Sequence, residues 1–156
     1  MKITLMQVGG TVDKYLKSGV AEYVKRLSHY TKFSIVEIAD LKNAAKLSRD
    51  ELKKREGEEI LKRLSNDDQV ILLDNRGIMY SSEEFADFIQ GNMNRSTRHL
   101  VFIIGGAFGF SDEVYSRGNG QFSLSRMTFS HRMIRLLFTE QLYRAFTILR
   151  NEPYHH

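Results

Sequence analysis

Cysteine is absent from the 156 residues of this chain, and proline occurs once, at Pro153. The lack of cysteine excludes disulfide bonds, zinc–thiolate sites and thiol catalysis, and we expect no metal cofactor. No apolar run approaches the roughly 20 residues that cross a bilayer. The opening residues, MKITL, lack the apolar core and small-residue cleavage site of a signal peptide. We therefore expect a cytoplasmic protein that makes no use of a membrane.

The length fits one domain spanning residues 1–156, and it is sufficient to bury a real core. Hydrophobic residues make up 42% of the chain and charges of both signs are plentiful, which is typical of a folded protein. The formal net charge is +4. This mild excess suits a polyanionic partner such as nucleic acid, although many small soluble proteins are equally basic.

Strand and helix patterns alternate from end to end, without a repeat or a linker. Short apolar or β-branched runs predict strands at residues 2–8, 33–38, 70–73, 100–104 and 121–125. Helical spacing fills the intervals between them, and Pro153 follows a final helix over 131–149. This alternation predicts an α/β fold with a mostly parallel sheet and helices on both faces. Ligands of such sheets bind beyond the carboxyl ends of the strands, so the loops after residues 73, 104 and 125 are the places to seek chemistry.

Helix starts are marked by capping boxes, Ser48-x-x-Glu51 and Ser81-x-x-Glu84. The final helix is apolar nearly all round, with a polar strip expected only near Arg132, Arg135 and Thr139. A helix of this kind must be buried on nearly every side. A second copy of the chain would supply the missing surface and predicts a homodimer. The alternative is a helix buried within its own subunit.

Glycines follow one of the buried strands in the segment 103–109, IIGGAFG. Glycine lets a backbone approach a ligand closely. The segment matches neither the dinucleotide fingerprint nor a P-loop, so a plain turn is an equal interpretation. Asp74 follows the neighbouring buried strand. It could bind a ribose or an amine, or it could cap the turn.

Two further segments could carry chemistry. In the loop 124–131, Ser125, Met127 and Thr128 could line a small-molecule pocket, and Ser130 could cap the last helix. The carboxyl-terminal Tyr154-His155-His156 follows a helix that carries Arg144 and Arg150. Aromatic rings beside guanidinium groups suit an exposed base and its phosphate. The alternatives are a frayed terminus or, for the two histidines, the remains of a purification tag.

These segments together resemble one family, the RlmH methyltransferases of the SPOUT superfamily, which modify a pseudouridine of large-subunit ribosomal RNA. The resemblance runs from MKITLMQVG through AEYVKRL, REGEEIL, LLDNRG and FIIGG to SLSRMTFSHRMIRLLFTEQLYRAF and EPYHH. The SLSRMTF segment, the LYRAF helix and the Tyr-His ending are its most specific parts. The chain departs from the usual pattern at Ser130, where proline is common, and at His156, where lysine or arginine is common.

The resemblance implies a trefoil knot near the carboxyl terminus and S-adenosylmethionine as the cofactor. The matching cofactor contacts would be Leu73, Gly105, Leu124, Ser125, Arg126, Met127, Thr128 and Phe129. Tyr154 and His155, with Arg144, would lie near the target base. The resemblance also implies that this tail completes the site of the partner subunit in a homodimer.

The implied reaction moves a methyl group to N3 of a pseudouridine in 23S ribosomal RNA, on an assembled ribosome. The imide nitrogen must lose a proton, and His155 could accept it because an imidazole has an ordinary pKa of about 6.5. Alternatives are a SPOUT methyltransferase acting on another ribosomal or transfer RNA base, and a ribosome-binding protein without catalysis. A nicotinamide-dependent enzyme is disfavoured because the fingerprint is missing after the first strand.

Overall fold

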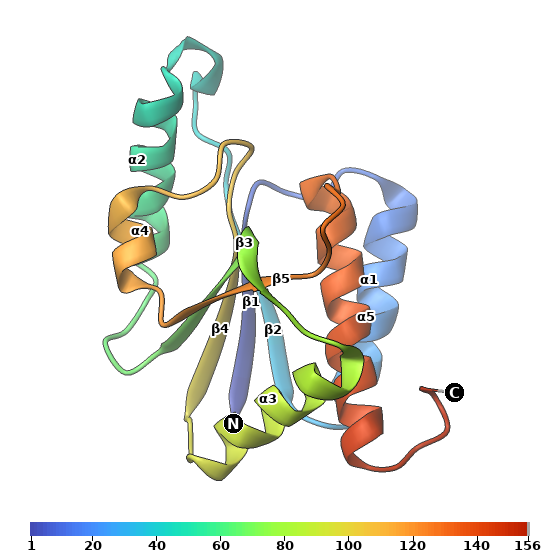
Figure 1. Ribbon diagram of the computed structural model, residues 1–156. Helices are drawn as coiled ribbons and strands as arrows, with labels where there is room; N and C mark the ends of the chain where they lie inside the picture. The colour runs from blue at the N-terminus through green and yellow to red at the C-terminus, as the bar shows by residue number, and fades with distance from the viewer. Residues whose placement is uncertain (156) are drawn as a thin grey trace.

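The computed structural model describes residues 1–155 and forms an α/β fold (Figure 1). Its sheet has the strand order β2-β1-β4-β3-β5, and every pairing is parallel. The predicted fold class is confirmed, while the trefoil knot implied by the resemblance stays a prediction. The strands are β1 (Lys2–Val8), β2 (Lys32–Ile38), β3 (Gln69–Met79), β4 (His99–Ile104) and β5 (Gly120–Ser123). The helices are α1 (Lys14–Leu27), η1 (Ala44–Lys46), α2 (Arg49–Leu61), α3 (Ser82–Asn94), α4 (Asp112–Arg117) and α5 (His131–Leu149).

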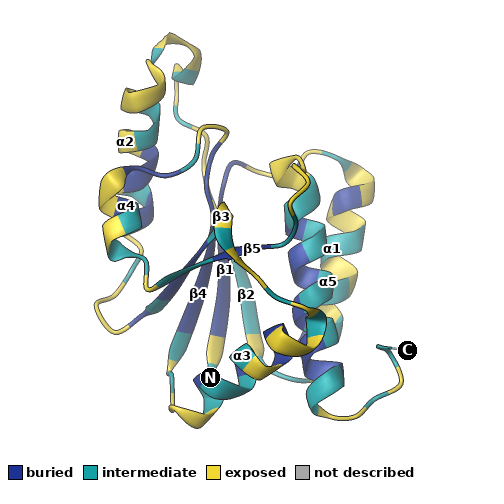
Figure 2. Ribbon diagram, viewed as in Figure 1, coloured by how far each residue is buried: buried dark blue, intermediate teal, exposed yellow. Residues whose placement is uncertain are grey.

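Helices cover both faces of the sheet. Helices α1, α3 and α5 lie on one face, and α2 and α4 lie on the other (Figure 1). Successive strand residues point to opposite faces, so Leu5 packs in the cluster beneath α5 and Met6 in the cluster beneath α2 and α4. The central strands are buried on both sides, as the dark blue ribbon in Figure 2 shows. This is why they read as continuous apolar runs rather than alternating ones.

Serine side chains begin four of the helices. Ser48 and Ser81 each form the predicted capping box with the glutamate three residues later. Ser111 and Ser130 each accept a hydrogen bond from the backbone N–H three residues on, at the start of α4 and α5. Each such cap stabilises its helix by roughly 1 kcal/mol. The cap at Ser130 fixes the point where the loop 124–130 becomes α5.

Helix α5 differs from its sequence-based prediction. Arg135 and Thr139, expected on a polar strip, are 2% and 0% exposed. The helix packs between α1 and α3 and against the sheet, so its apolar surface is covered largely within one chain. Thr139 satisfies its hydroxyl by donating to the carbonyl of Arg135, one turn back. Burial of α5 therefore does not by itself require a second subunit.

Strand β3 is longer than the predicted segment 70–73. Its pairing with β5 runs as far as Leu73, the register then shifts, and the pairing resumes at Ile78 and Met79. The two strands approach so closely there that a Cβ on Gly77 would lie 2.5 Å from the backbone nitrogen of Phe122. The segment between the two pairings contains polar residues, so a search for apolar runs does not detect that the strand continues past Leu73. The shift places Asp74 at the edge where the strands end.

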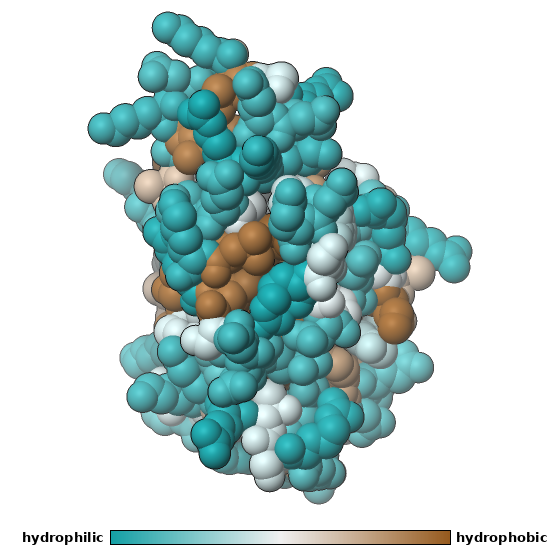
Figure 3. All heavy atoms as spheres, turned by 90° about the vertical axis from the view of Figure 1, so that its left-hand side faces the viewer, coloured by the Kyte–Doolittle hydropathy of each residue, from teal (hydrophilic) through white to brown (hydrophobic). Residues whose placement is uncertain are grey.

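The surface on the side of α2 and α4 is mostly hydrophilic, with a compact apolar patch near the centre of the view in Figure 3. Among residues 1–155, no helix has both the length and the apolar character needed to cross a membrane. The same residues contain no group of three or more histidine, aspartate or glutamate side chains placed to hold a metal ion.

Candidate functional site

A cavity of about 660 Å³ lies at the carboxyl ends of β3, β4 and β5. Its wall contains residues from the three predicted loops together with the first turn of α5. Arg126 is exposed and is not part of the wall, in contrast to its neighbours. The other seven cofactor contacts implied by the resemblance all line the cavity: Leu73, Gly105, Leu124, Ser125, Met127, Thr128 and Phe129.

The glycine turn after β4 shapes one wall. A Cβ on Gly105 would lie 3.0 Å from the Phe110 ring, which folds back against the turn. A Cβ on Gly106 would overlap the carboxylate of Glu56, which reaches the turn from α2. Both positions therefore require glycine for close packing. The turn also brings its own backbone to the cavity surface.

The loop after β5 forms the opposite wall and is held by its own serines. Ser123 donates a hydrogen bond to the carbonyl of Ser125 at 2.9 Å, and the Ser125 hydroxyl accepts one from the N–H of Met127 at 2.9 Å. Met127 is 75% exposed and Phe129 is 37% exposed. Apolar side chains held outward beside a cavity provide a surface for a flat ligand.

Asp74 caps its turn and also lines the cavity, while its binding of a ribose or an amine stays a prediction. It accepts hydrogen bonds from the Arg76 side chain and backbone and from the Tyr115 hydroxyl. Desolvation alone would raise the pKa of Asp74, but the hydrogen bonds from Tyr115 and Arg76 outweigh it and lower that pKa. The carboxylate is therefore ionised at neutral pH. Tyr115 was not predicted, because only the fold brings it to this loop.

His131 also lines the cavity, at the first position of α5. Desolvation at the wall, followed by the charge of Arg135, lowers its pKa, so the ring is neutral at pH 7. Arg135 itself is buried and donates to the carbonyls of Val8 and Gly9, at 2.8 Å each. This contact ties the end of β1 to the start of α5. His131 was not predicted as a site residue, although its position directly after the loop 124–130 could have indicated it.

The residues predicted to lie near the target base, in the carboxyl-terminal tail and on α5, are not part of the cavity wall. Tyr154 stacks edge-on against Tyr143, and its hydroxyl bonds to Tyr23 and Glu140 at 3.1 Å each. Burial, followed by these hydrogen bonds, raises the pKa of Tyr154. Arg144 forms an ion pair with Glu140 at 2.6 Å and lies over the Tyr154 ring. The structure thus brings Arg144 and Tyr154 together.

His155 joins the same end of α5, where its Nε2 lies 2.7 Å from Glu83 at the start of α3. His156 lies outside the described residues. Arg150, considered with the tail from sequence, stacks instead over Tyr30. Ile134 lines the cavity, and along the axis of α5 it lies about 15 Å from Arg144. Within one chain the predicted catalytic residues and the predicted cofactor contacts do not meet.

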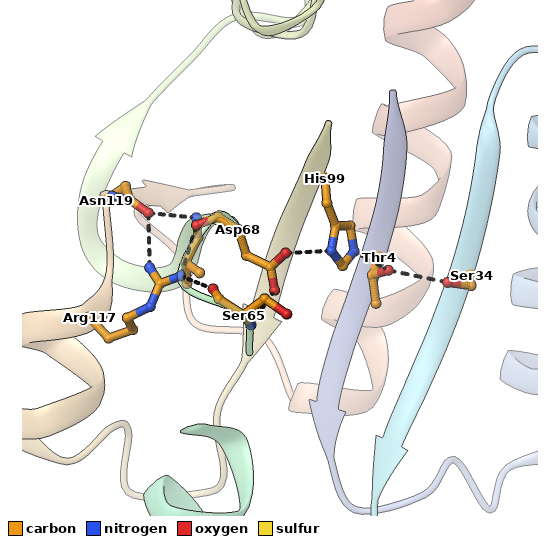
Figure 4. A network of polar contacts seen from close by, with 8 residues as sticks. Thr4, Ser34, Ser65, Asp68, His99, Arg117 and Asn119 are labelled. Carbon is orange, nitrogen blue, oxygen red and sulfur yellow. Dashed lines mark hydrogen bonds and ion pairs between the residues drawn. The ribbon is translucent and has the colours of Figure 1, made fainter. Parts of the chain in front are cut away.

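A second polar cluster lies toward the amino ends of the strands (Figure 4). His99 bonds to Asp68 at 2.7 Å and to the Thr4 hydroxyl at 2.8 Å, and Thr4 bonds on to Ser34. The order of groups matches an acid–histidine–hydroxyl triad. Thr4, however, is 3% exposed, which leaves a substrate no access to its hydroxyl. The cluster therefore serves to join β1, β2 and β4.

The fold and the cavity define a class: an α/β protein with a cavity of small-molecule size beyond the carboxyl ends of a parallel sheet. A family model described as "Predicted SPOUT methyltransferase" matches residues 1–155. Proteins named ribosomal RNA large subunit methyltransferase H are 53% identical over 156 residues in Flavobacterium psychrophilum, Cytophaga hutchinsonii and Porphyromonas gingivalis. Each alignment covers 100% of this chain and 99% or more of the relative. The chain therefore belongs to the SPOUT methyltransferases, in the RlmH family.

Proposed function

We propose that this protein is an S-adenosylmethionine-dependent methyltransferase that modifies N3 of a pseudouridine in large-subunit ribosomal RNA. Membership of a methyltransferase family supports the reaction class, and the names of the relatives support the RNA. The observation that carries the proposal is the cavity, because seven of the eight positions matched to cofactor contacts converge on it from three separate loops.

The residues present suit this cofactor. The volume of about 660 Å³ lies within the range of small-molecule sites. Leu124, Met127 and Phe129 offer apolar surface to a purine ring, and the ionised Asp74 offers an acceptor to ribose hydroxyls. When bound, S-adenosylmethionine would supply a methyl group on a positively charged sulfur, and that sulfur is itself the good leaving group because it departs as a neutral thioether. The task of the protein is to align that group with the nucleophile.

The remaining task is to hold the target base and accept its proton. We assign it to Tyr154, His155 and Arg144, where an aromatic ring, an imidazole and a guanidinium group lie at one end of α5. None of these three residues lines the cavity of its own chain, and Arg144 lies about 15 Å along α5 from Ile134 of the cavity wall. The proposal therefore requires the tail of one subunit to serve the cavity of another. His131 is the imidazole already in the cavity wall, and it is the alternative proton acceptor.

We therefore propose a homodimer, although the burial of α5 no longer argues for it. Its support is the split site together with apolar side chains exposed near the cavity end of the molecule. Val12 is 65% exposed and Tyr15 is 70% exposed, beside the start of α5. A two-fold dimer that sets this end of each chain against the tail of the other would cover these side chains and complete two identical sites.

The mouth of the cavity carries features that suit RNA. The guanidinium of Arg49 lies 4.9 Å from the centre of the Phe108 ring, and that ring is 45% exposed. Lys53 lines the wall nearby, and Arg126 is exposed on the opposite loop. Cations beside an exposed aromatic ring can pair with phosphate and stack on a base. So few contacts favour an assembled ribosome over free RNA as the substrate, and a ribosomal substrate supports a cytoplasmic location.

The test is methyl transfer to ribosomes from a strain that lacks this gene, with labelled cofactor and mapping of the modified base. We expect label at N3 of one pseudouridine of 23S RNA. Label on another ribosomal base or on transfer RNA would contradict the assigned target and leave the reaction class intact. Cofactor binding without any transfer would favour a ribosome-binding protein that lacks catalysis.

A further inference from the structure

A hollow of about 600 Å³ lies at the amino ends of the strands, at the opposite end of the parallel sheet from the cavity. Its exposed cations are Lys2 at the start of β1, Lys32 at the start of β2 and Arg98 just before β4. We call these three residues the amino-end surface. Among residues 1–155, no carboxylate lines this hollow and none of the three cations forms an ion pair. The hollow is therefore positively charged, with no acid of its own chain to offset it at close range.

The register of the sheet sets these charges side by side. Lys2 lies opposite Lys32 on β2 and opposite His99 on β4. Neighbouring strands are about 4.8 Å apart, and like charges held at such a separation repel one another. The carboxylate of Asp68 is engaged by His99, in the cluster of Figure 4. A neutral residue at Lys2 or Lys32 would remove the repulsion between them, so the pair suits an anion that arrives from outside the chain.

Hydrogen bonds between the three segments hold the backbone beneath the amino-end surface. The N–H of Lys2 donates to the carbonyl of Arg98 at 2.9 Å. The hydroxyl of Thr31 donates to the carbonyl of Met1 at 3.0 Å. The cations therefore extend from a fixed platform, which limits the entropy lost when they bind a charged chain.

The same end of the molecule carries the tail. Figure 1 shows the amino terminus and the end of α5 at one end of the ribbon, away from the site loops. Tyr30, two residues before Lys32, lies under the guanidinium of Arg150, 4.4 Å from the centre of its ring. The hydroxyl of Tyr30 donates to the carboxylate of Glu152, which is thereby engaged. One chain thus presents its tail and the amino-end surface together, joined through Tyr30 and Arg150.

We propose that the amino-end surface binds the phosphate backbone of ribosomal RNA beside the target base, on the subunit that donates the tail. The inference rests on the proposed function, in which Tyr154 and His155 hold that base. A base held by the tail brings its flanking phosphates toward the cations of the same chain. Phosphate contacts position a nucleic acid without reading its sequence. The amino-end surface therefore adds affinity to the few contacts at the mouth of the cavity.

The test measures binding to large ribosomal subunits that lack the modification, by cosedimentation at several salt concentrations. It compares the unsubstituted chain with the amino-end variant, which carries Lys2→Gln, Lys32→Gln and Arg98→Gln. Each phosphate contact contributes roughly 0.7–0.9 to the slope of log affinity against log salt. The amino-end variant should bind at least about tenfold more weakly at about 0.1 M salt, with a slope smaller by about 2–3. Its binding of S-adenosylmethionine should be unchanged in calorimetry, because none of the three residues lines the cavity.

The matched control carries Lys54→Gln, Lys62→Gln and Arg63→Gln, which remove the same charge from exposed positions on α2 and just after it. The control should keep both the affinity and the salt slope of the unsubstituted chain. Unchanged affinity and slope in the amino-end variant would overturn the inference, as would an equal loss in the control. Weaker binding with an unchanged slope would also overturn it and would indicate contact with a ribosomal protein instead of phosphate.

Methyl transfer separates this inference from the proposed function. Binding that depends on the amino-end surface without any transfer would refute the proposed function and leave the RNA contact in place. Full transfer that does not depend on the surface would do the reverse.

Mixed dimers decide which subunit is used. Pairing a Gly105→Val chain, which donates the tail, with a chain that ends at Pro153 leaves one complete site per mixed dimer. The three amino-end substitutions should raise the KM for ribosomes when they are placed in the Gly105→Val chain. An equal rise when they are placed in the truncated chain would contradict the assignment to the tail donor.

Discussion

Gly77→Ala tests whether the close approach of β3 and β5 holds the cavity in shape. The added Cβ would lie 2.5 Å from the Phe122 nitrogen, 2.6 Å from the Gln121 carbonyl carbon and 2.7 Å from the Phe122 carbonyl carbon. These are backbone atoms of a paired strand, so they cannot rotate away as a side-chain tip could. Overpacking of this kind costs about 1–3 kcal/mol. The displaced strand leads directly into the loop 124–129.

The magnitude follows from the size of the chain. An unfolding entropy of about 2.1 cal/mol/K per residue over 156 residues gives about 330 cal/mol/K, so each kcal/mol shifts Tm by about 3 °C. Gly77→Ala should therefore lower Tm by about 3–9 °C and weaken S-adenosylmethionine binding. Gly91→Ala is the control: its Cβ would meet only the Arg95 guanidinium at 3.9 Å, inside α3. The gain in helix propensity, up to about 1 kcal/mol, should raise Tm by up to about 3 °C.

Thermal unfolding followed by circular dichroism, with calorimetry of cofactor binding, checks both variants. A Gly77→Ala protein that melts at or above the unsubstituted temperature would refute the close approach. Normal melting of Gly77→Ala together with lost binding would likewise contradict the packing account of this strand pair.

Three further predictions concern the cavity, the assembly and the tail. Gly105→Val should weaken S-adenosylmethionine binding at least about tenfold by calorimetry, because a branched side chain would fill space that the Phe110 ring already limits to 3.0 Å; unchanged affinity in a folded variant would rule out this wall. Light scattering at micromolar concentration should give about twice the chain mass of 18.1 kDa, and a monomer mass would remove the basis for a shared site. Backbone hydrogen bonding at the start of α3, followed by the contact with His155, lowers the pKa of Glu83 to about 2. Because the pKa is lowered, the contact should be fully present above the ordinary carboxyl range and should be lost as the pH falls through about 2. Carbon-detected NMR measures the titration of Glu83, and a midpoint near 4.5 would contradict the docked tail.

Local patterns predicted the elements that depend on local physics. The capping boxes at Ser48 and Ser81 and the buried parallel strands follow from rules that act within a few residues. The three site loops could also be predicted, because the carboxyl ends of parallel strands meet at one edge of the sheet. For the same reason the glycine turn and the loop after β5 converge on one cavity.

The features that could not be predicted depend on contacts between distant residues. Nothing near Arg135 shows that its guanidinium reaches the carbonyls of Val8 and Gly9, so it was assigned to a polar strip. Glu56 looks like one of several charges on a solvated helix until Gly106 is placed against it. The position of the tail required the length and direction of α5, which separate Tyr154 from the cavity.

Subunit mixing tests the central claim, that methyl transfer occurs at a site made from the cavity of one chain and the tail of another. Gly105→Val keeps the tail and loses the cavity, whereas a chain that ends at Pro153 keeps the cavity and loses Tyr154 and His155. On ribosomes that lack the modification, the truncated chain alone should be at least about a hundredfold less active than the unsubstituted chain. Gly105→Val alone should be at least about tenfold less active when the cofactor is below saturation. Their mixture should recover about a quarter of full activity, because random pairing makes half of the dimers mixed and each mixed dimer contains one complete site. A mixture that forms mixed dimers and stays as inactive as its components would contradict the account.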